Sequence, residues 1–119
     1  MKNEKLIHDW MVSYLKDRLS RDYNAVKINI EDKKNDFKGH YPDLILGNHG
    51  MVLALMEVET DGSITPEKAD EWKTLTGIGA KLILMVPKTS KAKVVDLLWK
   101  KGMADKVSVG SYELTVNMP

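Results

Sequence analysis

Three carboxylates at the ends of two apolar segments are the residues of this sequence best suited to chemistry. Asp43 opens the first segment, 43–46, and Glu57 and Glu59 lie at the end of the second, 51–58. Removing an unpaired carboxylate from water costs several kcal/mol, and the group then tends to stay protonated. These charges therefore need compensation, and a divalent cation is the simplest candidate.

The connection between the two segments decides whether the carboxylates can meet. Gly47-Asn48-His49-Gly50 is typical of a hairpin turn, because glycine and asparagine tolerate positive φ. Directly opposed residues of an antiparallel pair share a face of the sheet. A two-residue loop at Asn48-His49 would send Asp43 and Glu57 to opposite faces, so a shared site needs an odd loop such as His49-Gly50-Met51. The predicted register pairs Asp43 with Glu57.

Pro42-Asp43, the hairpin and Glu57-Val58-Glu59 resemble the pattern proline-aspartate, spacer, acid-x-lysine of the PD-(D/E)xK nuclease superfamily. The resemblance is most direct over residues 24–86. It implies a restriction-endonuclease-like α-β-β-β-α-β core and metal-dependent hydrolysis of phosphodiesters. Asp43, Glu57 and the backbone carbonyl of Val58 would then bind the metal. Such hard oxygen donors suit Mg²⁺ or Mn²⁺.

Glu59 departs from this pattern, because it occupies the position that usually holds a lysine. A carboxylate cannot stabilise the negative charge of the transition state as an ammonium group would. Some restriction enzymes that the sequence resembles here carry glutamate at this position, as metal ligand or general base. Alternatively, Lys73, next to Trp72 on the following predicted helix, could reach back as a displaced lysine. The predicted catalytic residues are thus Asp43, Glu57, Glu59 and Lys73.

Two interpretations without catalysis remain open for the same acids. In the first, Asp43 begins a strand in a turn, while Glu57 and Glu59 leave the sheet edge to face solvent or pair with lysines. In the second, the chain keeps the nuclease fold without its activity and serves as a nucleic-acid-binding or protein-interaction module.

Other titratable side chains have simple structural interpretations. His8 is interpreted as a partly exposed helix residue and His49 as part of the turn. His40 is a loop residue that could contact a phosphate or the water of a metal ion. Glu4 could approach the same face of the sheet, but it equally suits the first turn of a helix, where an acid favours the helix dipole.

The segments around the acids predict an α/β fold in which one mixed sheet lies between helices. The expected order is helix, three strands, helix, strand, helix, strand. The first helix begins at an Asn3 cap and carries an apolar stripe at three- and four-residue spacing. This stripe consists of Leu6, Ile7, Trp10, Met11, Tyr14, Leu15 and Leu19.

Alternation, caps and helix breakers predict the remaining elements. A half-buried strand is expected at 26–30, and the strand at 51–58 is apolar on both faces and therefore central. Thr65 caps a second helix, which has Pro66 at its first position and ends near 77–79. A buried strand at 81–86, a helix at 90–102 and one or two edge strands at 107–116 follow. The helices should bury Ala69, Trp72, Leu75, Val94, Val95, Leu97, Leu98 and Trp99.

Length and composition predict one cytoplasmic domain over residues 1–119. The chain has no cysteine, and its longest apolar run, 51–56, is too short to cross a membrane. The net charge of +1 gives no overall attraction to nucleic acid, so binding would have to be local. A lysine-rich stretch at 88–106 is either a solvated helix face or a contact for a nucleic-acid backbone. The expected partners are nucleic acid, DNA more than RNA, and a second copy of the chain in a homodimer.

Overall fold

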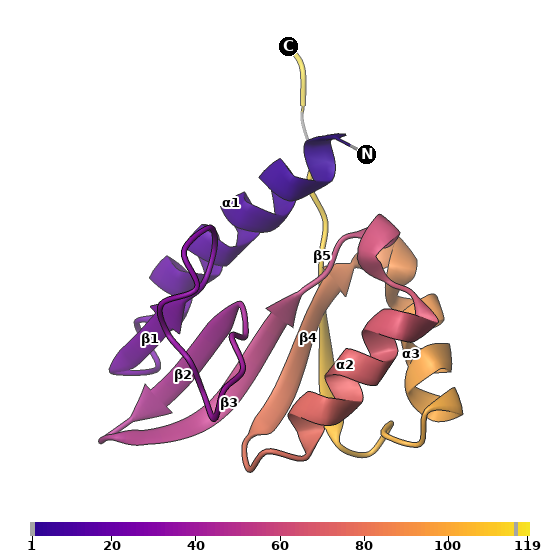
Figure 1. Ribbon diagram of the computed structural model, residues 1–119. Helices are drawn as coiled ribbons and strands as arrows, with labels where there is room; N and C mark the ends of the chain where they lie inside the picture. Colours follow the sequence, from indigo (N-terminus) through magenta and orange to yellow (C-terminus); the bar gives the residue numbers. More distant parts are fainter. Residues whose placement is uncertain (1, 116) are drawn as a thin grey trace.

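The computed structural model describes residues 2–115 and 117–119, which form three α-helices and a five-stranded mixed sheet (Figure 1). The elements are α1 (Lys2–Leu19), β1 (Ala25–Ile28), β2 (Leu44–Asn48), β3 (Met51–Val58), the 3₁₀ turn η1 (Asp61–Ser63), α2 (Pro66–Thr76), β4 (Lys81–Pro87), the 3₁₀ turn η2 (Lys88–Ser90), α3 (Lys91–Lys100) and β5 (Val107–Tyr112). The predicted α/β class and order of elements are confirmed. Val116, at the end of the last predicted strand, lies outside the described residues.

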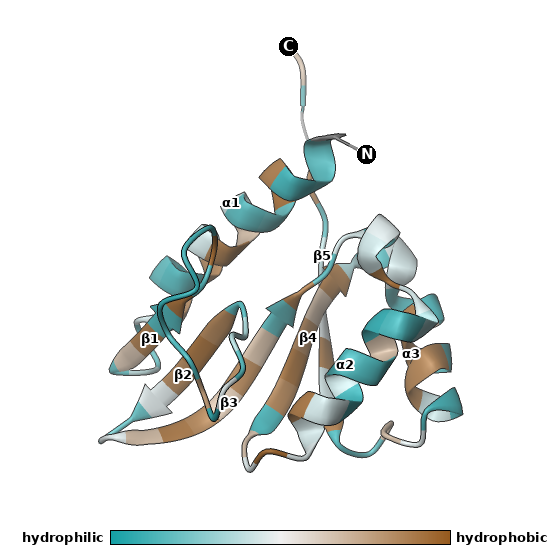
Figure 2. Ribbon diagram, in the orientation of Figure 1, coloured by the Kyte–Doolittle hydropathy of each residue, from teal (hydrophilic) through white to brown (hydrophobic). Residues whose placement is uncertain are grey.

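The sheet has the order β1-β2-β3-β4-β5, antiparallel from β1 to β3 and parallel from β3 to β5. α1 packs on β1 and β3, while α2 and α3 cover the opposite face over β4 and β5 (Figure 1). Alternate residues of β3 serve the two cores, with Met56 facing α1 and Leu55 facing α2 and α3. β3 is therefore central, as its apolar sequence predicts, and Figure 2 shows the hydrophobic character of β2 to β4.

α1 buries a different face from the predicted one. The residues of α1 buried against the sheet are Met11, Val12 and Leu15. Three residues of the predicted stripe, Leu6, Trp10 and Tyr14, are instead 70%, 52% and 45% exposed. The stacked rings of Trp10 and Tyr14, with centroids 5.4 Å apart, cover part of each other's surface.

The physical reason is that apolar residues surround more than half of this helix. The apolar pattern then does not decide which side of the helix faces the sheet. The choice is open by about one residue position, which is a rotation of roughly 100° about the helix axis. Contact with Leu44 and Met56 on the sheet selects the face centred on Val12. This rotation also turns His8, one turn before Val12, towards the end of the sheet.

α3 shows a smaller departure from the predicted burial. Val94, Leu97 and Leu98 are buried as predicted, but Val95 and Trp99 are exposed. Only one side of α3 faces the sheet, and the two exposed residues lie one turn apart on the other side.

The hairpin between β2 and β3 reaches the predicted register by a different route. Its loop is His49-Gly50, both with positive φ, so the predicted three-residue loop is wrong. Leu46 pairs with Ala54 but Gly47 pairs with Val52, which leaves Leu53 as the extra residue of a β-bulge. The bulge supplies the odd residue, and Leu44 pairs with Met56. One further step along this register places Asp43 opposite Glu57.

The bulge makes Gly47 intolerant of a side chain. A Cβ at Gly47 would lie 2.6 Å from the Met51 carbonyl oxygen, whereas one at Gly77 would meet its nearest neighbour at an ordinary 3.6 Å. We expect Gly47→Ala to lower the free energy of unfolding by about 1–3 kcal/mol, because backbone must move to relieve the clash. Gly77→Ala, the matched control, should be neutral or slightly stabilising. Urea denaturation measures both, and equal midpoints for the two variants would contradict the bulge.

Candidate functional site

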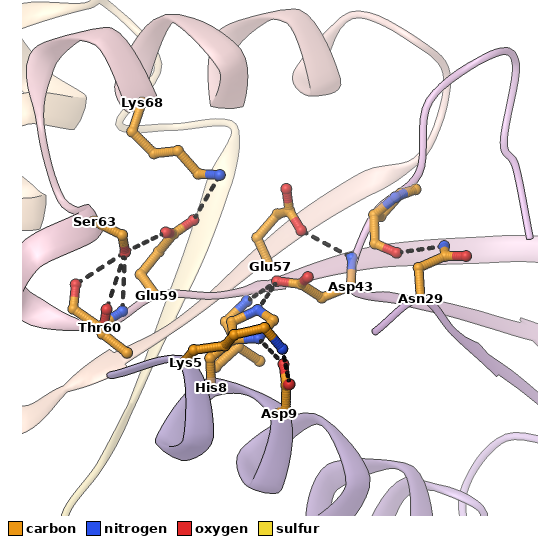
Figure 3. A network of polar contacts seen from close by, with 12 residues as sticks. Lys5, His8, Asp9, Asn29, Asp43, Glu57, Glu59, Thr60, Ser63 and Lys68 are labelled. Carbon is orange, nitrogen blue, oxygen red and sulfur yellow. Dashed lines mark hydrogen bonds and ion pairs between the residues drawn. The ribbon is translucent and has the colours of Figure 1, made fainter. Parts of the chain in front are cut away.

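The three predicted acids gather where β2 begins and β3 ends, between α1 and α2 (Figure 3). Asp43 immediately precedes β2, Glu57 is near the end of β3, and Glu59 follows that strand. A cleft of about 190 Å³ opens beside them. It is lined by Glu4, Lys5, His8, Asp43, Val58, Glu59, Thr60, Ser63 and Lys68.

Asp43 is tied to the end of β3 by two hydrogen bonds, one with the Glu57 side chain and one with the Val58 backbone. The Asp43 N–H donates to Glu57 Oε2 at 2.9 Å, and the Val58 N–H donates to Asp43 Oδ2 at 2.8 Å. The register is the predicted one, but the side chains diverge. Glu57 faces α2, whereas the Asp43 carboxylate turns across the strand end towards His8 of α1. The expectation that both carboxylates point to one face is corrected, because Asp43 lies just outside the pleated strand.

The carbonyl of Val58 is left without a ladder partner from β2. Continuing the register by two residues from the pair of Leu44 with Met56 places Pro42 opposite Val58. Proline has no N–H, so it cannot donate to this carbonyl. The Pro42 carbonyl itself accepts a hydrogen bond from Asn29 Nδ2 at 2.7 Å. Pro42 thus keeps a backbone oxygen available beside the Asp43 carboxylate.

Glu57 is a buried carboxyl group in a central strand, which is an unusual position for an acid. It is 9% exposed, and burial is the main reason that its pKa lies well above the ordinary value. The nearby negative charge of Asp43 raises this pKa further, while the hydrogen bond from the Asp43 N–H and the charge of Lys68 lower it. In the absence of a further cation, the Glu57 carboxyl group is held towards its neutral form.

Glu59 is bound on all sides by protein groups. It is 2% exposed; its Oε2 accepts a hydrogen bond from Trp72 Nε1 at 2.9 Å, and its Oε1 accepts one from Ser63 Oγ at 2.7 Å. Lys68 Nζ lies 4.0 Å from Oε2. Burial raises the Glu59 pKa, and Lys68, Trp72 and Ser63 oppose this. The Glu59 carbonyl accepts a hydrogen bond from Tyr112 Oη at 2.7 Å. Glu59 is therefore an anchor for α2 and β5.

The lysine that reaches the acids is Lys68, not the predicted Lys73. Lys68 lies in the first turn of α2, and the charges of Glu59, Glu57 and Asp43 raise its pKa against the opposing effect of burial. Lys73 is exposed and lies about 7.5 Å further along the helix axis. Its ammonium group has no ion pair or hydrogen bond within the described ranges. A sequence signal existed, because Lys68 precedes the buried Trp72 by four residues and thus shares its helix face.

His8 is the site residue that sequence reasoning missed. Its Nε2 lies 3.0 Å from Asp43 Oδ2, and its Nδ1 lies 2.9 Å from Asp9 Oδ1. The hydrogen bond with Asp43 is the main cause that raises the His8 pKa to about 9, against the opposing effect of burial. The imidazole is therefore protonated at neutral pH in the metal-free protein. Its position four residues before Val12 is a signal for this contact, but the apolar stripe in the sequence predicts another buried face of the helix.

Glu4, the other acid considered on the first helix, also reaches this end of the sheet. Its Oε1 accepts a hydrogen bond from Thr60 Oγ1 at 2.9 Å, and its Oε2 accepts one from the Gly62 N–H at 3.2 Å. Glu4 thereby fixes the start of α1 against the turn η1. It lines the cleft without bonding to Asp43 or Glu57.

His40 and His49 lie apart from this cluster. His40 lines a second cleft of about 400 Å³, on the α2 side, together with Tyr41, Glu57 and Lys68. His49 is in the hairpin loop, as predicted.

The lysine-rich stretch at 88–106 is partly neutralised by acids from other elements. Lys93 pairs with Asp61 at 2.9 Å, Lys100 with Asp96 at 2.9 Å and Lys101 with Asp70 at 2.9 Å. Two of these acids are outside the stretch, so its net positive charge is lower than the sequence indicates.

Among residues 2–115 and 117–119, no three Asp, Glu or His side chains form a group that could hold a metal ion. None of the described helices has the length and apolar character needed to span a membrane. Comparison of the chain with protein-family models, with curated proteins and with solved structures gave no match.

The raised pKa of Glu57 predicts a pH-dependent stability. The folded protein binds a proton at Glu57 at pH values where the unfolded chain, with a pKa near 4.5, does not. Stability should therefore fall as pH rises above about 4.5. Glu57→Gln removes this loss and should raise the melting temperature of the metal-free protein by several degrees at pH 8, but not at pH 4. Glu67→Gln, at an exposed position of α2, is the control. An unchanged pH profile in Glu57→Gln would show that Glu57 is not held neutral.

The raised pKa of His8 predicts a second contribution to stability that is lost as pH rises, here because the folded protein stabilises the charged form of the group. Its pKa is about 9 when folded and 6.5 when unfolded, so its stabilisation is complete below pH 6.5 and is lost as pH rises through 9. One pKa unit corresponds to about 1.4 kcal/mol, so His8→Gln should cost roughly 1–3 kcal/mol at pH 6 and little at pH 10. Urea denaturation of metal-free protein at both pH values measures this, with His40→Gln as control. A cost that does not change with pH would rule out the ion pair with Asp43.

Proposed function

We propose that the protein is a metal-dependent phosphodiester hydrolase acting on nucleic acid, built on a restriction-endonuclease-like core of the PD-(D/E)xK type. The observation that carries the proposal is the hydrogen bonding of Asp43 to the Glu57 carboxylate and to the Val58 N–H, where β2 begins beside the end of β3. The order of elements and the placement of helices on both faces of the sheet support the same fold type. A central strand gains no stability from a buried acid, so a site is the better explanation of Glu57.

The donor atoms at this position are of the kind that a divalent cation binds, and the Glu57 carboxylate would turn from α2 towards Asp43 to share one. Asp43, Glu57 and the Val58 carbonyl supply hard oxygen atoms, the kind that Mg²⁺ and Mn²⁺ take. Pro42 leaves the Val58 carbonyl without a ladder donor. Burial and the nearby charge of Asp43 raise the Glu57 pKa, and a cation at this carboxyl group would replace the proton that the raised pKa favours. When bound, such an ion would polarise a phosphodiester oxygen and activate a water molecule for attack.

Lys68 and Glu59 divide the role that a single lysine has in the usual pattern. Lys68 places a positive charge beside the acids, where it can bind a non-bridging phosphate oxygen and stabilise the charge that develops there. Glu59 positions this lysine from the strand end and is itself held by Trp72. In this proposal Lys68, and not the predicted Lys73, replaces the lysine of the usual pattern.

A second function has its own support in the charges at the site. His8 already pairs with Asp43, and Lys68 pairs with Glu59, so two of the three acids have cations from the protein. A chain in which these pairs are permanent would bind nucleic acid or another protein without cleaving a substrate. The exposed Trp10, Tyr14 and Trp99 would then provide contact surface.

Metal-induced stabilisation separates these two functions. Mn²⁺ or Mg²⁺ at 100 times its dissociation constant should stabilise the wild type by about 2.7 kcal/mol, because it binds the folded state. Asp43→Asn and Glu57→Gln should lose this response, whereas Glu67→Gln should keep it. Differential scanning calorimetry measures the shift. A wild type that responds to neither ion, or acid variants that respond as it does, would reject the hydrolase.

Cleavage then tests the two lysines directly. Lys68→Ala should lower the rate of phosphodiester cleavage by about 100-fold or more, and Lys73→Ala should change it less than about twofold. The substrates are supercoiled plasmid and labelled single-stranded DNA and RNA. Asp43→Asn, purified in the same way, measures contaminating nuclease. Equal losses in the two lysine variants would remove Lys68 from its assigned role.

A further inference from the structure

His8 has the surroundings of a metal-binding histidine. Its Nδ1 lies 2.9 Å from Asp9 Oδ1, and Asp9 Oδ2 lies 2.7 Å from Lys5 Nζ. A carboxylate can only accept, so Nδ1 carries the proton of this hydrogen bond, and Nε2 faces Asp43. Histidines that bind metals commonly donate their second ring N–H to a carboxylate, which fixes the ring and makes the free nitrogen a better donor.

The distance between His8 and Asp43 also fits a shared cation. Two ligand atoms that are each about 2.1 Å from an ion and at right angles to one another are about 3.0 Å apart. The separation of His8 Nε2 from Asp43 Oδ2 is 3.0 Å. A cation could therefore take the place of the proton between these atoms without movement of the backbone.

Access to this pair is open from one side. The side chains of His8 and Asp43 are 25% and 18% exposed, and both line the cleft of about 190 Å³. The cleft leaves room for water ligands, and Val58 is among the residues that line it. The cleft is also lined by two further acids and two competing ammonium groups, those of Glu4, Glu59, Lys5 and Lys68.

We propose that His8 is a metal ligand together with Asp43, and that it makes the site prefer Mn²⁺ and later first-row divalent ions over Mg²⁺. The inference rests on the proposed function, and it specifies which divalent cations that site prefers. Imidazole nitrogen suits transition metals, whereas Mg²⁺ favours oxygen ligands and keeps its waters. The predicted ligands Asp43, Glu57 and Val58 supply oxygen atoms alone. His8 of α1 adds the nitrogen donor.

Direct binding tests this selectivity. Isothermal titration calorimetry with Mn²⁺ and with Mg²⁺ is done on the full chain. Wild type should bind Mn²⁺ at least about 10-fold more tightly than Mg²⁺. His8→Gln should lose about 10-fold or more in Mn²⁺ affinity and change its Mg²⁺ affinity less than about threefold. Asp9→Asn should weaken Mn²⁺ binding by about 10-fold through the ring orientation. His40→Gln, the matched control, should behave as wild type.

Pulsed electron paramagnetic resonance of the Mn²⁺-bound protein gives a readout that a structural role would not move. Wild type should show the ¹⁴N coupling of a coordinated imidazole, and ¹⁵N-labelled histidine should convert it to a ¹⁵N coupling. The coupling should persist in His40→Gln and vanish in His8→Gln. The labelled wild type keeps the test decisive even if His8→Gln fails to fold.

The outcomes distinguish this inference from the proposed function. Absence of nitrogen coupling, or an unchanged ratio of Mn²⁺ to Mg²⁺ affinity in His8→Gln, overturns the role of His8. Metal binding that still requires Asp43 would then leave the proposed function standing. Binding of neither ion, or binding that survives Asp43→Asn, overturns both.

Discussion

The register of the β2–β3 hairpin is the constraint on which the rest of the site depends. A slip of one residue would send every side chain of β3 to the other face of the sheet. The bulge at Leu53, the positive φ of the His49-Gly50 loop and the missing side chain of Gly47 together hold this register. It allows the Asp43 N–H to donate to Glu57 and the Asp43 carboxylate to accept from the Val58 N–H, and it places Glu59 directly after β3.

Charge compensation then connects the strand ends to the helices. Buried carboxylates are tolerated only when cations or hydrogen-bond donors approach them. α1 supplies His8 to Asp43, and α2 supplies Lys68 and the indole of Trp72 to Glu59. Glu57 receives a backbone N–H as its hydrogen-bond donor, and it is the acid with the strongest tendency to stay neutral. The arrangement gives up stability at Glu57, a cost that the proposed metal site would account for.

The elements of the fold could be predicted because their signals are local. Pro66 after the Thr65 cap, the alternation around β1 and the apolar run of β3 each arise within one element. The buried face of α1 could not be predicted in the same way, because apolar residues surround most of the helix. The hairpin loop was mispredicted because glycine and asparagine in a row permit several loops, and the bulge at Leu53 depends on pairing across the strands.

The sequence by itself determined the α/β class and the order of elements. It also identified Asp43, Glu57 and Glu59 as the candidate site residues, because an acid in an apolar strand is conspicuous whatever surrounds it. Tertiary structure decided which cations meet those acids. Lys68 rather than Lys73 reaches Glu59 because α2 packs with Trp72 inward, and His8 reaches Asp43 because the sheet covers the Val12 face of α1. Both outcomes depend on how whole helices are rotated against the sheet. That rotation is set by the packing of the complete core and by no single segment of the chain.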